Sequence, residues 1–175
     1  MLDTRALINY GGEKMKNKTL DLVYRTHGEG KEKIVFLRDF VLKHDRTNFY
    51  ENIQDTLEFF YKHIPLHFAY EEVVINALLK NNKLTRDQLS NIDRIMQEHI
   101  ILKKNFEKLK EMSTKIGKRS TKEQREDFLC IVNETVEALI KHAEYEDQYL
   151  YPVAEMITDD VVLSIVEKEM SKIVY

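Results

Sequence analysis

Residues 128–153 read FLCIVNETVEALIKHAEYEDQYLYPV, and one set of positions in this stretch recurs every three or four residues. That spacing places side chains on one face of an α-helix. The stripe consists of Phe128, Val132, Thr135, Leu139, His142, Glu146, Tyr149 and Val153. We therefore predict a helix that buries a histidine and a carboxylate among apolar residues. Its start is predicted at Ser120 or Thr121, with Glu123 or Gln124 completing a capping box.

The same periodicity occurs three more times, over residues 20–43, 48–80 and from Thr85 to about 115. The stripe of the last segment includes Leu89 and Lys103. Thr85 begins the sequence T-R-D-Q, which also predicts a capping box. A shorter helix is expected from Asp159 to Ile173. The connections at 44–47, 81–84 and 116–119 are short, which makes successive helices antiparallel neighbours. We therefore predict an all-α, up-down-up-down antiparallel four-helix bundle with a short extra C-terminal helix. Residues 1–175 are expected to form one domain, with the bundle core at about 17–156.

Composition excludes several classes of protein. The net charge of -3 gives no electrostatic support for nucleic-acid binding. Cys130 is the only cysteine, so disulfides and cysteine-based metal sites within one chain are excluded; we expect it to be a small buried core residue. No apolar run approaches about 18 residues and the start lacks an apolar signal core, so we expect neither a membrane span nor a signal peptide. The cytoplasm is the expected location.

The chemistry is predicted from where the histidines fall. Each of the four predicted helices carries one histidine in its apolar stripe, and two of these histidines are followed four residues later by a glutamate. The six residues are His27, His67, Glu71, His99, His142 and Glu146. Counting residues from each turn, at about 1.5 Å per residue, places them at similar levels along the bundle.

A buried carboxylate without a partner is costly, and a metal ion removes that cost. A single buried histidine is more often structural, but six such residues together favour a metal site. Four histidines and two carboxylates suit two iron ions bridged by the carboxylates, with manganese or zinc as alternatives. His44 and His63 lie off this pattern. We expect a structural role for His44, and for His63 a position at the surface or behind the metal ligands.

The segments HFAYEE (67–72) and HAEYEDQYLYP (142–152), with His27 and His99, resemble the H…HxxxE…H…HxxxE signature of hemerythrin-like (HHE cation-binding) domains. The resemblance implies a non-haem di-iron four-helix bundle in which Glu71 and Glu146 bridge the metals. Two departures stand out. Lys103 replaces a second third-helix histidine of the oxygen carriers, and Asp147 at i+5 competes with Glu146 as a ligand. Glu146 is preferred, because Asp147 lies about 140° around a regular helix from His142.

The set is closer to six-ligand variants of the family, which include the domain of iron–sulfur cluster repair proteins. Those proteins usually carry a cysteine-containing N-terminal module, which we do not expect here because Cys130 is the only cysteine among residues 1–175. The leading hypothesis is therefore a di-iron protein that binds or senses oxygen or a related small ligand such as nitric oxide. The alternative is an iron-handling protein or an oxidase or ferroxidase, including a role in cluster repair. A ferritin-type site is disfavoured because no glutamate stands three residues before a candidate histidine, and HExxH is absent, which excludes a zincin.

Overall fold

The computed structural model describes residues 20–43, 49–80, 83–117, 120–157 and 159–173, without the side chains of 40–43, 49–53 and 55. Four long helices dominate: α1 (Asp21–Lys43), α2 (Phe49–Lys80), α3 (Arg86–Lys115) and α4 (Lys122–Tyr149). Two short ones follow, α5 (Tyr151–Ala154) and α6 (Asp160–Met170). The described residues contain no strand, so the predicted all-α fold with a short extra helix is confirmed. His44 lies outside the described residues.

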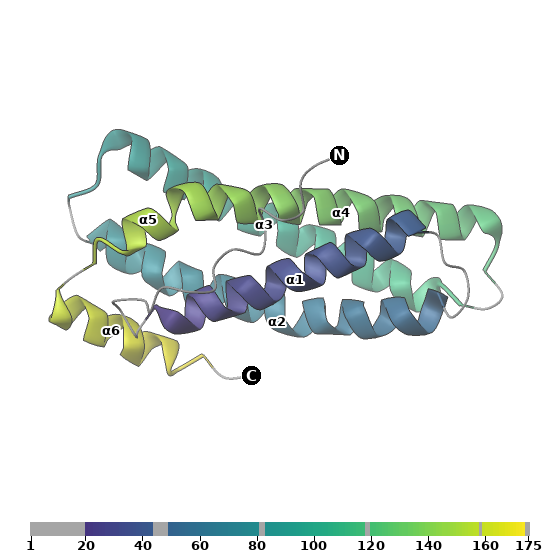
Figure 1. Cartoon of the computed structure of the whole chain (residues 1–175), viewed down its shortest axis with the longest axis horizontal. Helices are drawn as coiled ribbons and strands as arrows, with labels where there is room; N and C mark the ends of the chain where they lie inside the picture. The colour runs from purple at the N-terminus through teal and green to yellow at the C-terminus, as the bar shows by residue number, and fades with distance from the viewer. Residues whose placement is uncertain (1–19, 44–48, 81–82, 118–119, 158, 174–175) are drawn as a thin grey trace.

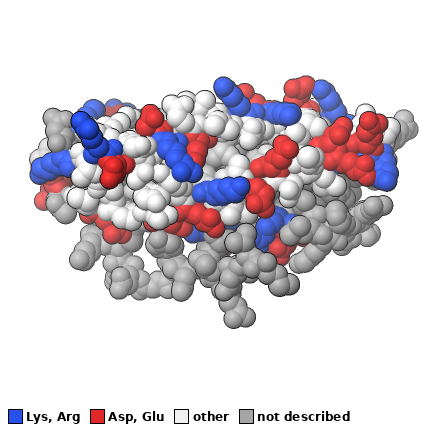
Figure 2. Space-filling view, turned by 90° about the horizontal axis from the view of Figure 1, so that it is seen from above, with Lys and Arg blue, Asp and Glu red and all other residues white. Residues whose placement is uncertain are grey.

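The long helices run alternately in opposite directions along one axis (Figure 1). Helix α1 packs against α2 and α4, and α3 packs against the same two helices, which closes the bundle around a central core. Within the described residues, no helix combines the length and apolar character that a membrane span requires. Lysine, arginine and acidic side chains lie interspersed on the face seen in Figure 2.

Two predicted capping boxes fix the starts of α3 and α4. The Thr85 hydroxyl accepts the backbone N–H of Gln88 at 3.2 Å, and the Gln88 side chain accepts the Thr85 N–H at 2.9 Å. Thr121 and Gln124 form the same pair of hydrogen bonds at 3.2 and 2.9 Å. Each box satisfies two N–H groups that the first helical turn would otherwise leave without partners. Thr121 rather than Ser120 is therefore the N-cap of α4.

The apolar core consists of two clusters, one toward each end of the bundle. One contains Leu20, Val74, Ile75, Ile92 and Leu150, and the other contains Leu57, Phe60, Leu102, Phe106 and Phe128. In every long helix the predicted histidine stands between residues of the first cluster and residues of the second. The four histidines therefore form a polar layer that is enclosed by apolar side chains at both ends. These side chains exclude water, so electrostatic interactions within the layer are strong.

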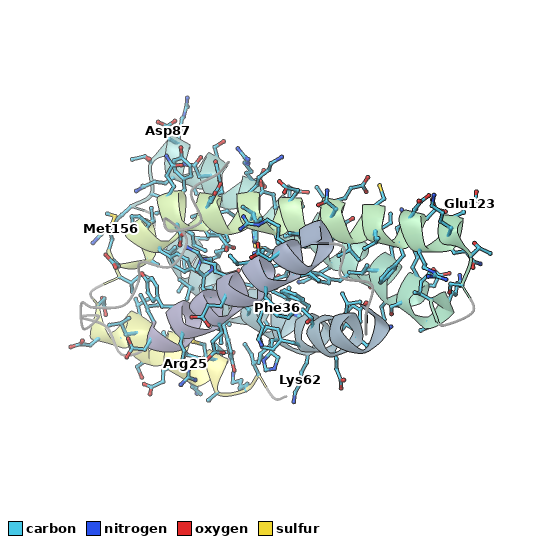
Figure 3. All side chains as sticks on the ribbon, turned by 45° about the vertical axis from the view of Figure 1, so that its right-hand side comes forward. Arg25, Phe36, Lys62, Asp87, Glu123 and Met156 are labelled. Atoms are coloured by element: carbon cyan, nitrogen blue, oxygen red, sulfur yellow. The ribbon has the colours of Figure 1, made fainter. Side chains whose placement is uncertain are left out.

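The structure corrects three details of the sequence prediction. Helix α4 ends at Tyr149, and Val153 belongs to α5, because Pro152 lacks an N–H group and cannot continue a regular helix. On α3, Ile95 is fully buried whereas Leu89 is 43% exposed. Leu89 lies in the first turns of α3. This end of the helix, where Asp87 is labelled in Figure 3, projects beyond the neighbouring helices, so Leu89 remains exposed.

Cys130 is exposed and does not enter the core, which is the third correction. It stands about 200° around the helix from both Phe128 and Val132, which are buried. Its thiol instead lies 3.6 Å from the carboxylate of Glu134.

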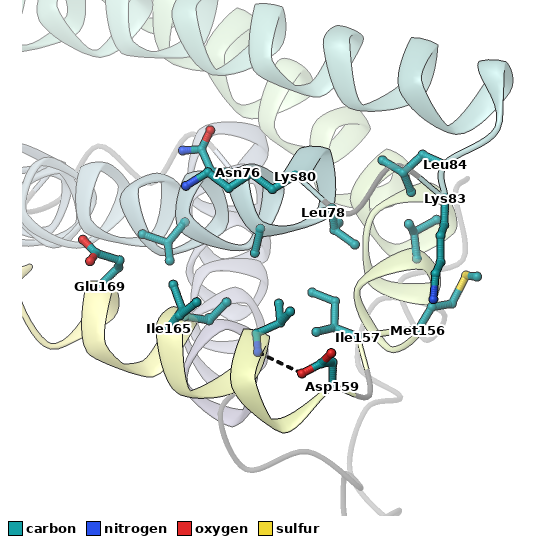
Figure 4. Close-up of a pocket in the computed structure, with 15 residues that line it drawn as sticks. Asn76, Leu78, Lys80, Lys83, Leu84, Met156, Ile157, Asp159, Ile165 and Glu169 are labelled. Carbon is teal, nitrogen blue, oxygen red and sulfur yellow. Dashed lines mark hydrogen bonds between the residues drawn. The ribbon is translucent and has the colours of Figure 1, made fainter.

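Helix α6 covers the C-terminal part of α2 and leaves a cavity of about 530 Å³ between α2, α5 and α6 (Figure 4). Its lining includes Leu78, Ile157 and Ile165, and it contains none of the six candidate site residues. At its edge Asp159 caps α6 by accepting the Val161 N–H at 2.8 Å.

Candidate metal centre

The fold brings the six predicted residues together in the middle of the bundle. His27 comes from α1, His67 and Glu71 from α2, His99 from α3, and His142 and Glu146 from α4. The most exposed of the six side chains, His27, retains only 6% of its accessible surface, and Glu71 retains none. Because i and i+4 positions share a helix face, each glutamate points in the same direction as the histidine one turn before it.

The two carboxylates lie between two pairs of histidines. Glu71 Oε1 is 3.2 Å from His67 Nε2, and Glu71 Oε2 is 3.4 Å from His99 Nε2. Glu146 Oε1 is 2.7 Å from His142 Nε2 and 3.2 Å from His99 Nε2. Its other oxygen, Oε2, lies 3.5 Å from His27 Nδ1. Each carboxylate therefore directs one oxygen toward each histidine pair.

These contacts define two overlapping sets of potential metal ligands. One set is His27, His67, Glu71 and Glu146, and the other is Glu71, His99, His142 and Glu146. Within each set, one donor atom from every residue lies within 4.8 Å of the others. Glu71 and Glu146 belong to both sets, so the arrangement has the form of two adjacent ion positions that share two carboxylates.

The arrangement of the donor atoms suits bound metal ions better than it suits hydrogen bonds among the six residues. Glu71 Oε2, His99 Nδ1 and His142 Nε2 are buried and lack a hydrogen-bond partner among the described residues. The short contact from His142 Nε2 to Glu146 is therefore an ion-pair distance without hydrogen-bond alignment. His27 Nδ1 and His67 Nε2 face each other at 3.4 Å. Buried polar atoms are normally paired, and metal ions at the two positions would supply partners for Glu71 Oε2 and His142 Nε2.

The site is strongly coupled electrostatically. Burial lowers the pKa of His99, but its hydrogen bond to Glu146 and its ion-pair contact with Glu71 outweigh this and raise the pKa to about 9. For His142, burial is likewise outweighed by the negative charge of Glu146 and by the hydrogen bond to Glu98, which raise its pKa to about 10. Burial raises the pKa of Glu71, yet His67 and His99 hold it well below its usual value. Glu71 is therefore ionised, and the positive charge of neighbouring groups balances it.

Three of the histidines have a carboxylate behind the ring, on the side away from the shared glutamates. His27 Nε2 lies 3.0 Å from Asp147 Oδ1, and His142 Nδ1 lies 2.9 Å from Glu98 Oε2. His99 Nδ1 is 3.5 Å from Glu72 Oε1, a longer contact that is not a hydrogen bond. Carboxylates in such positions fix the orientation of a ligating imidazole and increase its basicity.

Each of these carboxylates is held by a cation. Lys31 pairs with Asp147, Arg94 with Glu98 at 2.8 Å, and Lys103 with Glu72 at 2.7 Å. The fourth histidine, His67, instead contacts the Thr26 hydroxyl through Nδ1 at 2.9 Å. Thr26 lies within 3.0 Å of the backbone carbonyl oxygens of Leu22 and Val23.

These contacts settle where Lys103 and Asp147 lie. The Lys103 side chain is 43% exposed and pairs with Glu72 instead of pointing at the shared glutamates. Asp147 points toward α1, as its angular position predicted, while Glu146 faces the centre. His63 stacks on Phe59 with ring centroids 4.4 Å apart and belongs to neither ligand set.

Tyr151 was not assigned to the site from the sequence. It is buried on α5, and its hydroxyl donates a 2.5 Å hydrogen bond to Glu71 Oε1. Its ring packs edge-on against His27, with centroids 4.8 Å apart. Burial and the negative charge of Glu71 raise the pKa of Tyr151 well above its usual value, so the hydroxyl remains a donor.

The sequence contained one signal for the residues that contact the histidines from outside the donor layer. Acidic side chains stand directly beside the motif residues, at Glu72, Glu98 and Asp147. Tyr151 and Thr26 carried no such signal, because their contacts depend on how α5 and α1 pack.

The fold and the geometry define a class, the helical bundles with a buried nitrogen and oxygen donor site suited to two metal ions. The family model of the hemerythrin HHE cation binding domain matches residues 90–172. This part of the chain is therefore similar to the hemerythrin HHE domain, and the family resemblance that the motifs predicted is confirmed there. The match includes His99, His142 and Glu146, whereas His27, His67 and Glu71 lie before it. Searches among curated proteins and solved structures gave no significant match.

Proposed function

We propose that this protein is a non-haem di-iron protein that binds or senses oxygen or a related small ligand such as nitric oxide. His27, His67, Glu71 and Glu146 would hold one iron, and Glu71, His99, His142 and Glu146 the other. The observation that supports this proposal most directly is the orientation of the two glutamates. Each points one oxygen toward each histidine pair, as bridging carboxylates must.

The donor count supports a site that accepts an external ligand. Each set offers four protein atoms, two from imidazoles and two from carboxylates. Iron in such nitrogen and oxygen environments takes about six ligands in octahedral geometry, so both positions retain room for exchangeable ligands. A ferrous pair would supply electrons and open coordination positions to the bound molecule.

The protein's own residues position the donors and keep the layer dry. Asp147, Glu98 and Thr26 hold the outer nitrogens of three histidines, which leaves the inner nitrogens directed at the centre. The two apolar clusters exclude water on either side. A preorganised and dehydrated donor set limits both loss of metal and uncontrolled reaction with solvent.

The proposal is tested by metal analysis and an optical spectrum of protein expressed with iron, recorded before and after exposure to air. About two irons per chain and oxo-bridged charge-transfer bands are expected. Glu71→Ala and Glu146→Ala should lose metal, whereas Glu144→Ala, an exposed position on α4, should retain it. Less than half an equivalent of any transition metal in the parent protein would refute the proposal.

The same experiment addresses the alternative role in iron handling or oxidation. Continuous consumption of oxygen with added ferrous iron would favour a ferroxidase. Stoichiometric binding of oxygen or nitric oxide, without turnover, would favour binding or sensing.

A further inference from the structure

The cavity between α2, α5 and α6 lies away from the candidate metal centre and is large enough for a small organic molecule. Its volume of about 530 Å³ falls within the range of about 300–1,000 Å³ that is usual for ligand pockets. Its walls come from the end of α2, from the segment before α3, and from α5 and α6 (Figure 4). None of the six candidate site residues lines it, so a ligand bound here would not touch the donor layer.

The walls of this cavity are mainly apolar. The apolar lining includes Leu78, Leu84, Val153, Ile157, Val162 and Val166. Met156 and Ile165 also line the cavity, yet they remain 61% and 50% exposed. Large apolar side chains that stay exposed around a hollow mark a surface that binds a ligand or a partner. The apolar part of a ligand in the cavity would cover these two side chains.

The charged side chains of the cavity leave positive charge without a partner. Two lysines and two acids line it: Lys80, Lys83, Asp159 and Glu169. Both acids are engaged, because Asp159 accepts the Val161 N–H at 2.8 Å and Glu169 pairs with Lys172 at 2.5 Å. The hydrogen bond from Lys172 lowers the pKa of Glu169, and the charge of Lys80 adds to this effect. Lys83 forms no ion pair with any residue that the structure describes.

Lys83 is therefore the group best placed to hold an anion. Figure 4 shows its side chain extending along one edge of the cavity toward Met156, with Glu169 at the opposite end. One ammonium group at the edge of an apolar cavity matches a molecule with an apolar body and one anionic group. The anion would stay at the exposed edge, so no charge would be buried without a partner.

We propose that this cavity binds an amphipathic monocarboxylate of the medium-chain fatty-acid type, free in solution. The carboxylate would lie at Lys83, and the hydrocarbon chain would lie between α2 and α6. The proposal does not depend on the proposed di-iron function, because the cavity and the donor layer share no residue. A protein without metal would leave it standing.

The first test is isothermal titration calorimetry of the full chain with octanoate, butanoate and 1-octanol. Octanoate should bind in a saturable manner with one molecule per chain. It should bind at least about tenfold more tightly than butanoate, because four more methylene groups are buried. It should bind about threefold more tightly than 1-octanol, since an exposed charge pair contributes only modestly. This series needs no variant, and the absence of saturable octanoate binding would overturn the proposal.

The charge assignment is tested with Lys83→Gln and Lys83→Arg. The glutamine variant should lose the preference for octanoate over 1-octanol, and the arginine variant should keep it. Lys104→Gln is the matched control, because Lys104 is an exposed lysine on α3 that does not line the cavity. Equal affinities of the parent for octanoate and 1-octanol would overturn the assignment of Lys83, as would equal effects of Lys83→Gln and Lys104→Gln.

The position of the ligand is tested with two substitutions on α6. Ile165 and Val161 are both exposed, at 50% and 70%, but only Ile165 lines the cavity. Ile165→Glu should weaken octanoate binding at least about fivefold, because a carboxylate in the wall repels the ligand and hydrates the apolar surface. Val161→Glu should bind octanoate as the parent does. Circular dichroism should show parent-like folding for every variant, since all the substituted positions are exposed. Equal losses in Ile165→Glu and Val161→Glu would place the ligand elsewhere and overturn the proposal.

Discussion

Replacing Tyr151 by phenylalanine removes one hydroxyl group from the centre and leaves the ring in place. In the metal-free protein this hydroxyl donates a 2.5 Å hydrogen bond to the ionised, fully buried carboxylate of Glu71. A hydrogen bond to a charged group contributes about 1.5–3 kcal/mol to stability. A change of 1 kcal/mol shifts the melting temperature of a domain of this size by about 2–4 °C. We therefore expect Tyr151→Phe to lower the melting temperature of the metal-free protein by about 3–12 °C.

The assay is thermal unfolding of metal-free protein followed by circular dichroism. Tyr145→Phe is the comparison, because its hydroxyl donates to a neutral acceptor, Asn91 Oδ1, at 2.7 Å. A neutral hydrogen bond contributes about 0.5–1.5 kcal/mol, so the smaller shift is expected there. A double-mutant cycle with Glu71→Gln isolates the interaction.

In the Glu71→Gln background, loss of the Tyr151 hydroxyl should cost less than half as much as in the parent, because the charged acceptor is gone. The reasoning is refuted if Tyr151→Phe destabilises the metal-free protein no more than Tyr145→Phe. It is also refuted if the cost is the same with glutamine at position 71.

Four further outcomes are expected. Removing metal with a chelator should lower the melting temperature clearly, because a metal that binds only the folded state adds stability by mass action; an unchanged melting curve after verified removal would argue against a central site. Glu146→Ala should lose metal and its optical bands, whereas Asp147→Ala should keep at least most of the metal, since Asp147 contacts His27 from outside; the reverse pattern in metal analysis would exchange the two roles. Thr121→Ala should destabilise the protein by about 1 kcal/mol through loss of the α4 cap, as measured by denaturant unfolding. Cys130 should react with a thiol reagent in the folded protein, because it is exposed, but slowly near neutral pH, since the Glu134 carboxylate raises the pKa of the thiol; a thiol that reacts only after unfolding would contradict the corrected position.

Periodicity and residue spacing were enough to predict the elements of the bundle and the six candidate site residues. Helical periodicity is local, so four stripes and two capping boxes could be read without knowledge of the fold. Histidines such as His27 and His99 were conspicuous because each interrupts an otherwise apolar stripe. The short connections implied antiparallel neighbours, and counting along them predicted that the six residues would meet. Their role as ligands remains a prediction.

Periodicity did not determine side-chain contacts between helices, which depend on the rotation and spacing of packed helices. The sequence placed Lys103 in the stripe of its helix, yet its long side chain turns outward to pair with Glu72. Nor could it single out Tyr151 among the tyrosines near the motifs as the residue that reaches Glu71, because Pro152 ends α4 and redirects the chain into α5.

The cavity between α2, α5 and α6, the small cavity that His27 and Gly30 line, and the ion pair of Lys31 with Asp147 are likewise products of packing between helices that are distant in sequence. The sequence could identify donor residues because their chemistry is carried by each side chain. The orientation of those donors, and the space that remains beside them, depend on how the helices pack and could not be predicted from any one segment.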